Sequence, residues 1–307
     1  MAVRHQPAGR SGEAPRGTAT ADFHAHTTRS DGVLEPAELV RQAAEAGVRL
    51  FAIADHDNLA AYRELTAPGA GPLPPGMELV PAVEINAITR GMDVEVPDGE
   101  VHVLGIGVDP DDDAFEAALA AQRSARRTRF FATVERLREI GLPVDAQVAL
   151  LDLTGDDALG RPTLARALMA AGHAESVDDA FGRILGHRRP GYVARTGLDP
   201  FEAIRAIRAA GGLASVAHFA AAHEHLPLMR ALVDAGLNGL ESHHRSFDAE
   251  QRNDVGGVAR RLGLVETGGS DYHGDLGPYA ETHAELVMPA PLVAGVRAAI
   301  DPTRIHR

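Results

Sequence analysis

The 307-residue sequence contains no lysine, cysteine or tryptophan, so its 30 residues of the Lys+Arg class are all arginine. Without lysine, the chain has no P-loop lysine, no Schiff-base lysine and no carbamylated lysine to bridge two metals. Without cysteine, it has no thiolate zinc site, iron–sulfur cluster, disulfide or thiol nucleophile. Histidine, carboxylates and hydroxyls are therefore left for chemistry, with arginine as the permanent cation.

Long hydrophobic runs are also missing, since no apolar stretch approaches the roughly 18 residues that a membrane span needs. The first residues lack the apolar core of a secretory signal. We therefore expect a cytoplasmic protein with no membrane partner. Residues 1–20 are rich in Gly, Pro, Ala and Arg and predict a disordered tail. The net charge of -13 argues against binding long duplex nucleic acid, which needs a broad basic surface.

Short apolar runs alternate with amphipathic stretches along most of the chain, which is typical of α/β proteins with parallel strands. The expected strands are Ala21–His24, Leu50–Ala54, Glu78–Val83, His102–Val108, Gly212–Ala217, Gly239–Glu241 and Val265–Gly268. One helix is expected to begin near Pro36 and to end before Gly47. Further helices are expected at Pro200–Ala210, Leu226–Ala235, Ala249–Leu262 and Leu292–Ile300.

This alternation stops between about Asp109 and Pro190, where the pattern predicts helices only. They are expected at Ala114–Ile140, Leu164–Ala171 and Val177–Leu185, with loops at Gly141–Pro143 and Thr154–Pro162. Helices inserted between two barrel strands would cap the strand ends, and we favour a cap over a plain surface insertion. The expected organisation is a tail at 1–20, a barrel at 21–108 and 191–307, and a helical insertion at 109–190.

Histidines and carboxylates follow nearly every expected strand. In chain order they are His24, His26 and Asp31, then Asp55, His56 and Asp57, then Glu84 with Asn86, then His218, then Glu241, His243 and His244, and finally Asp271 and His273. The ends of parallel barrel strands meet at one mouth. His102 is the exception, because it lies at the start of the fourth expected strand.

Each of these motifs alone has an ordinary explanation, such as a polar strand end, a hydrogen-bonded turn or a satisfied buried polar group. His24 and His26 would share one face of a strand, since side chains alternate with a period of two. The joint occurrence of the motifs at successive strand ends predicts a site for divalent metals such as Mn, Zn or Fe.

In this order the motifs resemble those of the PHP (polymerase and histidinol phosphatase) superfamily, and its small TrpH/YciV-like phosphoesterases in particular. They are His24-Ala25-His26 with Asp31-Gly32, Asp55-His56-Asp57, Glu84, His102, Ala217-His218 and Ser270-Asp271-Tyr272-His273-Gly274. The resemblance covers about Ala21–Leu286. It implies a distorted (β/α)7 TIM-like barrel with a helical insertion, and two or three divalent metals that hydrolyse phosphoesters.

Carried over by motif, the resemblance implies three overlapping sets of metal ligands. The first set is His24, His26, Glu84 and Asp271, the second is Glu84 with His102 and His218, and the third is Asp31, His56 and His273. Glu84 would bridge two metals, because the chain has no lysine to carbamylate. Catalysis would use a metal-activated water, with Glu84, Asp271 and His218 as supporting ligands. Asp55, Asp57 and Asn86 are expected to orient the ligands.

Arginine suits phosphate binding because its planar guanidinium matches two oxygens. Arg161 is the first candidate, since Gly160-Arg161-Pro162 resembles the family's Gly-Arg-Pro-His segment. The other candidates for substrate binding are Arg195, Arg245 and His244.

The chain departs from the family pattern at three positions. Thr163 and Phe247 stand where relatives usually have histidines that face the substrate, and Phe219 stands where proline is usual. We therefore expect the leaving group, or the number of phosphates contacted, to differ from the family pattern.

The basic run Arg123–Arg129 lies on the long expected helix and has two interpretations. We favour a solvated helix face, and the alternative is a basic groove for a nucleotide or short oligonucleotide.

The predicted function is a metal-dependent phosphoesterase that removes a phosphate from a nucleotide-like substrate, such as a nucleoside 3′,5′-bisphosphate. The enzymatic alternative is a phosphodiesterase, either a 5′–3′ exoribonuclease on short RNA or a cyclic phosphate hydrolase. A C–N hydrolase also stays open, because some relatives use glutamate in place of the bridging lysine. The alternative from another class is a non-catalytic metal-binding module.

Overall fold

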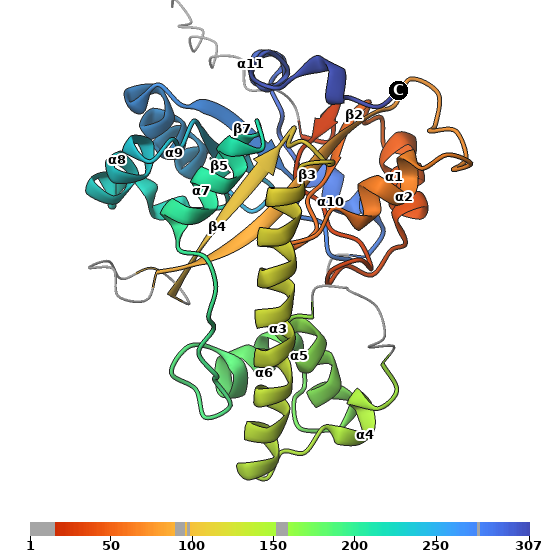
Figure 1. Cartoon of the computed structure of the whole chain (residues 1–307), viewed down its shortest axis with the longest axis vertical. Coiled ribbons are helices and arrows are strands. Elements are labelled where there is room, and N and C mark those ends of the chain that lie inside the picture. The colour runs from red at the N-terminus through yellow and green to blue at the C-terminus, as the bar shows by residue number, and fades with distance from the viewer. Residues whose placement is uncertain (1–15, 90–95, 97–98, 152–158, 275–276) are drawn as a thin grey trace, which may run out of the picture.

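The computed structural model describes residues 16–89, 96, 99–151, 159–274 and 277–307. Seven strands form one sheet in chain order (Figure 1). They are β1 (Ala21–Asp22), β2 (Leu50–Ile53), β3 (Glu78–Ile88), β4 (Glu100–Ile106), β5 (Leu213–Val216), β6 (Gly239–His244) and β7 (Val265–Gly269). Phe23 N donates to Gly268 O at 3.2 Å, and Ala25 bridges to Tyr272, so the two edges of the sheet meet. The predicted barrel-like α/β fold is confirmed.

The helices surround this sheet and fill the insertion. They are α1 (Pro36–Glu45), α2 (Ala60–Thr66), α3 (Asp113–Glu139), α4 (Asp145–Val148), α5 (Arg161–Ala170), α6 (Val177–Ala180), α7 (Pro200–Ala209), α8 (Leu226–Asp234), α9 (Ala249–Leu262), α10 (Tyr279–Glu285) and α11 (Ala290–Ala299). Short π- or 3₁₀-helical turns are η2 (Phe181–Leu185), η3 (Ala220–His223) and η4 (Pro302–Arg304). The pattern did not predict α2, α4 or α10, which are too short for a clear helical period.

One expectation about the sheet is wrong, because not all strands are parallel. β4 runs antiparallel to both β3 and β5, whereas the other neighbouring pairs are parallel. β3 also continues to Ile88, well past the predicted end at Val83, and pairs Asn86 with His102. The start of β4 therefore lies at the same mouth as the ends of the parallel strands. This removes the apparent exception of His102.

Local sequence signals set the helix boundaries. α7 begins with a capping box in which Asp199 and Glu202 satisfy each other's backbone N–H groups. α9 begins with the same motif, formed by Asp248 and Gln251, and ends at Gly263, whose φ of 68° favours glycine. These caps fix where the helices that cover β5, β6 and β7 begin and end.

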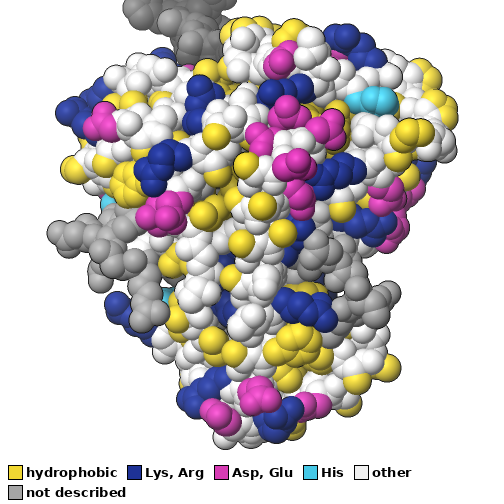
Figure 2. Space-filling model, viewed as in Figure 1, with side chains coloured by type: hydrophobic (Ala, Val, Ile, Leu, Met, Phe, Trp, Pro, Cys, Tyr) yellow, Lys and Arg dark blue, Asp and Glu magenta, His cyan; other side chains and the backbone are white. Residues whose placement is uncertain are grey.

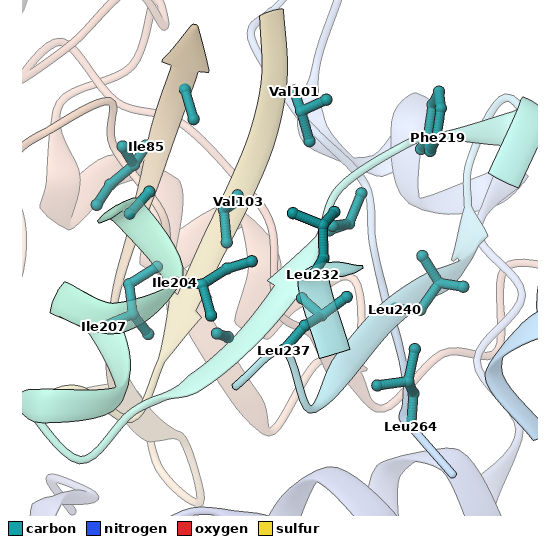
Figure 3. Packing of buried hydrophobic residues seen from close by; sticks show 14 of the residues in the cluster. Ile85, Val101, Val103, Ile204, Ile207, Phe219, Leu232, Leu237, Leu240 and Leu264 are labelled. Carbon is teal, nitrogen blue, oxygen red and sulfur yellow. The ribbon is translucent and has the colours of Figure 1, made fainter. Parts of the chain in front are cut away.

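The largest apolar cluster lies between the sheet and α7 to α9. Ile204 and Ile207 of α7 are fully buried against the β4 side of the sheet, near Val103 (Figure 3). A Cβ at Gly105 would lie 3.0 Å from the Ile207 side chain, so glycine lets α7 approach β4 closely. This packing holds the antiparallel strand that carries His102.

The predicted helical insertion is present between β4 and α7. α3 has 27 residues, about 40 Å at 1.5 Å per residue, and runs from the barrel to α4, α5 and α6 (Figure 1). The insertion has its own apolar cluster, which includes Phe130, Leu137, Leu164 and Leu185. One end of α3 thus packs on the barrel and the other end packs in the insertion.

Residues 16–20, which were predicted to belong to a disordered tail, contact the barrel. Gly17 N donates to Leu286 O, Ala19 is buried, and Thr20 O accepts from Arg49 N at 2.8 Å. These contacts make residues 16–20 part of the fold, although their composition resembles that of the preceding segment. Residues 1–15 lie outside the described part, as do 154–158 of the loop predicted at Thr154–Pro162.

In the described part of the chain, no helix has both the length and the apolar character to cross a lipid bilayer.

Replacing Ile207 by alanine tests the packing of α7 on β4. Ile207 is fully buried, so Ile207→Ala should lower the free energy of unfolding by about 2–5 kcal/mol in urea denaturation. Val177→Ala is the control, since Val177 is 39% exposed and its loss should change stability by less than about 0.5 kcal/mol. Equal stability of the two variants would contradict the packing described here.

Candidate metal centre and active site

The mouth of the barrel brings together all nine side chains that the motifs predicted as metal ligands. Their nitrogen and oxygen atoms form three groups, and within each group the atoms lie within 4.8 Å of one another. The groups are His24, His26, Glu84 and Asp271; Glu84, His102 and His218; and His26, Asp31, His56 and His273. The composition matches the three predicted sets, except that His26 also joins the third.

The first group has the dimensions of a metal coordination shell. His24 Nε2 lies 3.3 Å from Glu84 Oε2 and 3.3 Å from Asp271 Oδ1, and His26 Nε2 lies 3.2 Å from each oxygen. The two Nε2 atoms are 3.1 Å apart. Ligands at about 2.0–2.1 Å from a tetrahedral metal stand roughly 3.3 Å from one another. The four side chains therefore fit around one divalent cation.

Glu84 belongs to two groups because its two oxygens face different histidines. Oε2 faces the first group, and Oε1 lies 2.8 Å from His102 Nδ1 and 3.2 Å from His218 Nε2. His102 Nδ1 and His218 Nε2 are 3.1 Å apart. A carboxylate that bridges two cations needs this division of its oxygens.

The third group leaves a buried oxygen without a hydrogen bond. His273 Nε2 lies 3.2 Å from Asp31 Oδ1, and His56 Nε2 lies 3.5 Å from Asp31 Oδ2. Asp31 is 3% exposed, yet its Oδ1 has no hydrogen-bond partner in the part of the chain that the structure describes. Because such an atom is costly to bury, a cation at this position would stabilise it.

Burial and charge act in opposite directions on these side chains. Burial disfavours the ionised carboxylate of Glu84, but the imidazoles around it, His24 foremost, hold its pKa well below the ordinary value. Burial disfavours the imidazolium of His273, but Asp31 and Asp271 raise its pKa to about 10. The buried carboxylates thus require nearby positive charge. A divalent cation would supply it and would leave the imidazoles neutral, as ligation requires.

The backbone of the site is strained at three residues. Asp57, His218 and Asp271 have φ values of 52°, 33° and 47°, and in the described part only Arg188 is a further non-glycine residue with positive φ. Each such conformation costs on the order of 1–3 kcal/mol and persists only where its surroundings hold it. Asp271 N donates to His24 O at 2.6 Å, and Asp57 N donates to Glu84 O at 3.0 Å. Hydrogen bonds between site residues therefore hold these conformations.

Glu241 supports two of the groups, and the motif analysis did not assign it a role. Its Oε1 lies 3.1 Å from His24 Nδ1, and its Oε2 accepts from His218 N at 2.7 Å. A carboxylate on Nδ1 fixes the tautomer that presents Nε2 to a metal. β6 shifts register between Glu241 and His243, which lets Glu241 and His244 both reach the site. Period-two alternation could not have predicted this.

The predicted orienting groups contact the ligand-bearing loops. Asp55 accepts from Thr27 N at 2.7 Å and from Ser30 Oγ at 2.6 Å, and so fixes the loop that leads to Asp31. Asn86 Nδ2 lies 2.7 Å from His102 Nε2. Asp57 instead contacts arginines that border the substrate cavity.

A cavity of about 290 Å³ opens between the three groups and the insertion. Arg161 and Arg195, two of the predicted phosphate-binding residues, border it, and so do Arg126 and Arg129 of α3. The favoured interpretation of the basic run as a solvated face is therefore wrong for these α3 arginines. Arg126 is 6% exposed and donates to Asp57 and to Asn86. A periodicity of three along α3, at 123, 126 and 129, was the signal for one inward face.

The remaining predicted substrate residues lie elsewhere. Arg245 does not border the cavity, and neither does Thr163, the residue that replaces the family's histidine. His244 Nε2 lies 3.4 Å from Asp271 Oδ2, and Phe247 packs against the His244 ring at 5.4 Å between centroids. His244 therefore reaches the metal centre through Asp271, and Phe247 fills the space beside it.

Charge on the outer surface differs from charge in the cavity. On the face shown in Figure 2, described arginines and acidic side chains are interspersed, and they leave no broad basic area there. Four arginines instead border the cavity, next to the metal groups: Arg126, Arg129, Arg161 and Arg195. The molecule is thus suited to a small anion that enters the cavity.

Proteins with named activities on phosphate esters are similar to this chain. A 5′–3′ exoribonuclease of Haemophilus influenzae is 31% identical over 82% of this chain and 89% of its own length. A 3′,5′-nucleoside bisphosphate phosphatase of Chromobacterium violaceum is 28% identical over 83% and 87%. A phosphoribosyl 1,2-cyclic phosphate 1,2-diphosphodiesterase of Eggerthella lenta is 32% identical over 83% and 95%. No protein-family profile matches the chain.

Solved structures are similar over nearly the whole chain. A protein of Bifidobacterium adolescentis, assigned as a metal-dependent phosphoesterase, has a TM-score of 0.75 and 31% identity, covering 92% of this chain and 96% of that one. An amidohydrolase of Chromobacterium violaceum, solved with bound sulfate and no metal, has a TM-score of 0.78 and 25% identity, covering 94% and 98%. Fold, site and relatives define a metal-dependent hydrolase of phosphate esters. The chain belongs to the PHP-like metal-dependent phosphoesterase superfamily.

Removal of the Glu241 carboxylate should weaken metal binding without removing a ligand. We expect Glu241→Ala to lower the affinity for Mn²⁺ about ten- to hundredfold in titration calorimetry, because His24 loses its orienting partner. Glu241→Gln keeps one acceptor oxygen and should fall between wild type and Glu241→Ala. Glu266→Ala is the control, since Glu266 pairs with Ser242 and Arg260 outside the three groups. Equal metal affinity in all variants would show that Glu241 does not position His24.

Proposed function

We propose that this phosphoesterase removes a phosphate from a nucleotide-like substrate, such as a nucleoside 3′,5′-bisphosphate. One observation carries the proposal: metal-binding groups and buried arginines border the same cavity. A phosphate there would contact cations from two sides. The family membership favours this enzymatic interpretation over a non-catalytic metal-binding module.

The three groups are the proposed metal ligands. They would hold two or three divalent ions, with Glu84 as the bridge. Such ions, when bound, would activate a water and neutralise phosphate oxygens. Imidazole and carboxylate ligands suit Mn, Fe and Zn, so the ions in the cell would depend on supply as well as on affinity.

The side chains of this chain would bind and orient the phosphate. Arg161 borders the cavity, stacks over the Phe181 ring at 5.4 Å and lies 3.7 Å from Glu100. A guanidinium held in this way can present its planar edge to two phosphate oxygens. Asp271 borders the same cavity, and His244 Nε2 keeps its second oxygen in place at 3.4 Å.

The wall opposite the metal groups suits a nucleoside. Phe130, Leu164 and Phe181 of the insertion border the cavity there. Apolar and aromatic side chains with a few placed charges are typical of small-molecule sites. A ribose and base could pack against this wall while the phosphate faces the barrel. The bisphosphate phosphatase named above is consistent with a substrate of this kind.

A phosphodiesterase is the second candidate, and two observations favour it. The relatives include exoribonucleases and a cyclic phosphate diphosphodiesterase. Arg126 and Arg129 also border the cavity one helical turn apart, so a short nucleic acid backbone could follow them. This alternative uses the same metal ligands and differs in the bond that is cleaved.

Loss of a first-group ligand should abolish hydrolysis. In His24→Ala and Glu84→Ala we expect phosphate release with Mn²⁺ to fall at least a thousandfold, because each side chain belongs to the first group. His223→Ala should keep wild-type turnover, since this exposed histidine lies outside the groups. Unchanged turnover in either ligand variant would overturn the proposed site.

A substrate comparison separates the two candidate functions. With Mn²⁺ present, we expect inorganic phosphate to be released from a nucleoside 3′,5′-bisphosphate at a kcat/KM at least tenfold above that for a 5′-labelled oligoribonucleotide. Mononucleotides released stepwise from the labelled end at the higher rate would instead establish the exoribonuclease.

A further inference from the structure

Three arginines surround one buried carboxylate at the side of the cavity. Glu100 Oε1 lies 3.3 Å from Arg129 Nη1 and 3.7 Å from Arg161 Nη2, and Glu100 Oε2 lies 3.7 Å from Arg195 Nη1. Glu100 comes from the start of β4, Arg129 from α3, and Arg195 from the segment between η2 and α7. The barrel and both ends of the insertion thus converge here.

Two of these guanidinium groups keep unused hydrogen-bond donors. Arg195 is 3% exposed and donates Nη2 to Asp57 Oδ2 at 2.9 Å, but its buried Nε has no hydrogen-bond partner among the described residues. Arg129 donates Nε to Val193 O at 2.8 Å, and within the described part of the chain its buried Nη2 has no hydrogen-bond partner. Both residues border the cavity. Since arginine has no acceptor, these N–H groups need an incoming oxygen.

Positive charge exceeds negative charge at this position. Four guanidinium groups, of Arg126, Arg129, Arg161 and Arg195, meet the two carboxylates of Asp57 and Glu100. Burial first, and then the charge of Arg126, lower the pKa of Arg195 to about 10 even though Asp57 and Glu100 oppose the shift. The cluster would be stabilised by an anion.

This cluster adjoins the metal groups, since Glu100 Oε2 lies 3.8 Å from His102 Nε2. Arg126 contacts Asn86, whose Nδ2 lies 2.7 Å from His102 Nε2. Further along α3, Arg129 and Thr133 border the same cavity. From Arg126 to Thr133 the helix rises about 10 Å, which is more than one phosphate group spans. The cavity therefore continues along α3 beyond the residues that adjoin the metal groups.

We propose that Arg129 and Arg195, held by Glu100 and Asp57, form a binding site for a second oxyanion of the substrate, a phosphate that is not hydrolysed. This rests on the proposed function for the identity of the reacting phosphate. The site recognises a substrate with two phosphates and disfavours nucleoside monophosphates. Glu100 is a positioning residue, because it keeps the two guanidinium groups side by side.

Two variants and a matched control test this site in the metal-loaded full chain. The measurement is the ratio of kcat/KM for a nucleoside 3′,5′-bisphosphate to that for the nucleoside 3′-monophosphate. We expect Arg195→Gln and Arg129→Gln to lower this ratio about ten- to hundredfold, mainly through KM of the bisphosphate. Arg127→Gln should leave the ratio unchanged, because Arg127 stacks on Phe131 on the same helix and does not border the cavity.

Each outcome bears on the proposal. A lower ratio in both variants, with monophosphate turnover retained, supports it. Arg129→Gln serves alone if Arg195→Gln fails to fold by circular dichroism, since Arg195 is the more buried of the two. A wild-type ratio near one, or an unchanged ratio in the folded variants, overturns the proposal.

Failure of the proposed function is distinguishable from failure of this site. If neither substrate releases phosphate, binding of a nucleoside 5′-monophosphate to the metal-loaded protein is measured by calorimetry. Weaker binding in Arg129→Gln than in Arg127→Gln then supports the oxyanion site. Equal binding in these two variants overturns it.

Discussion

Glu84 carries a buried negative charge in contact with five imidazole rings, and the rest of the site is arranged around that contact. His24, His26 and His56 lie within 3.3 Å of its Oε2, and His102 and His218 lie within 3.2 Å of its Oε1. Glu84 is 1% exposed, so no solvent screens this charge. Five neutral rings cannot compensate it, and five charged rings would repel one another. Cations placed between the rings and the carboxylate would compensate the negative charge while the rings stay neutral. Metal binding would therefore stabilise the site.

The sheet serves this contact by reversing one strand. With β4 antiparallel, His102 at its start comes to the mouth where the parallel strands end. The same reversal places Glu100 at the edge of the cavity, where it pairs with arginines of the insertion. The backbone strain of the site is confined to a few residues, since Asp57, His218 and Asp271 have positive φ beside or within the ligand groups. Their backbone hydrogen bonds to site residues keep the strain from relaxing.

The sequence predicted the ligand clusters better than it predicted their supports. The resemblance to the PHP superfamily implied nine ligands, and the structure brings all nine of these side chains together in three groups. Strand direction was not predictable, since an apolar run does not show which way it pairs. Glu241 was noted at a strand end but was given no role, because a register shift in β6 changes which side chains face the mouth. The α3 arginines were predicted to face solvent, because the charge of a side chain does not show whether buried acceptors lie beside it in the fold.

In this lysine-free chain, arginine side chains connect the insertion to the barrel near the site. Arg126 spans Asp57 and Asn86 at once, and Arg166 of α5 donates to Asp31 O at 2.6 Å. A lysine ammonium is a compact point charge, whereas the guanidinium plane reaches two acceptors in fixed directions. The contacts between insertion and barrel near the site are thus polar and directional, and they end on the loops that carry the metal ligands. A shift of the insertion would therefore move the arginines that border the cavity and the loop of Asp31 together, which ties the shape of the cavity to the geometry of the three groups.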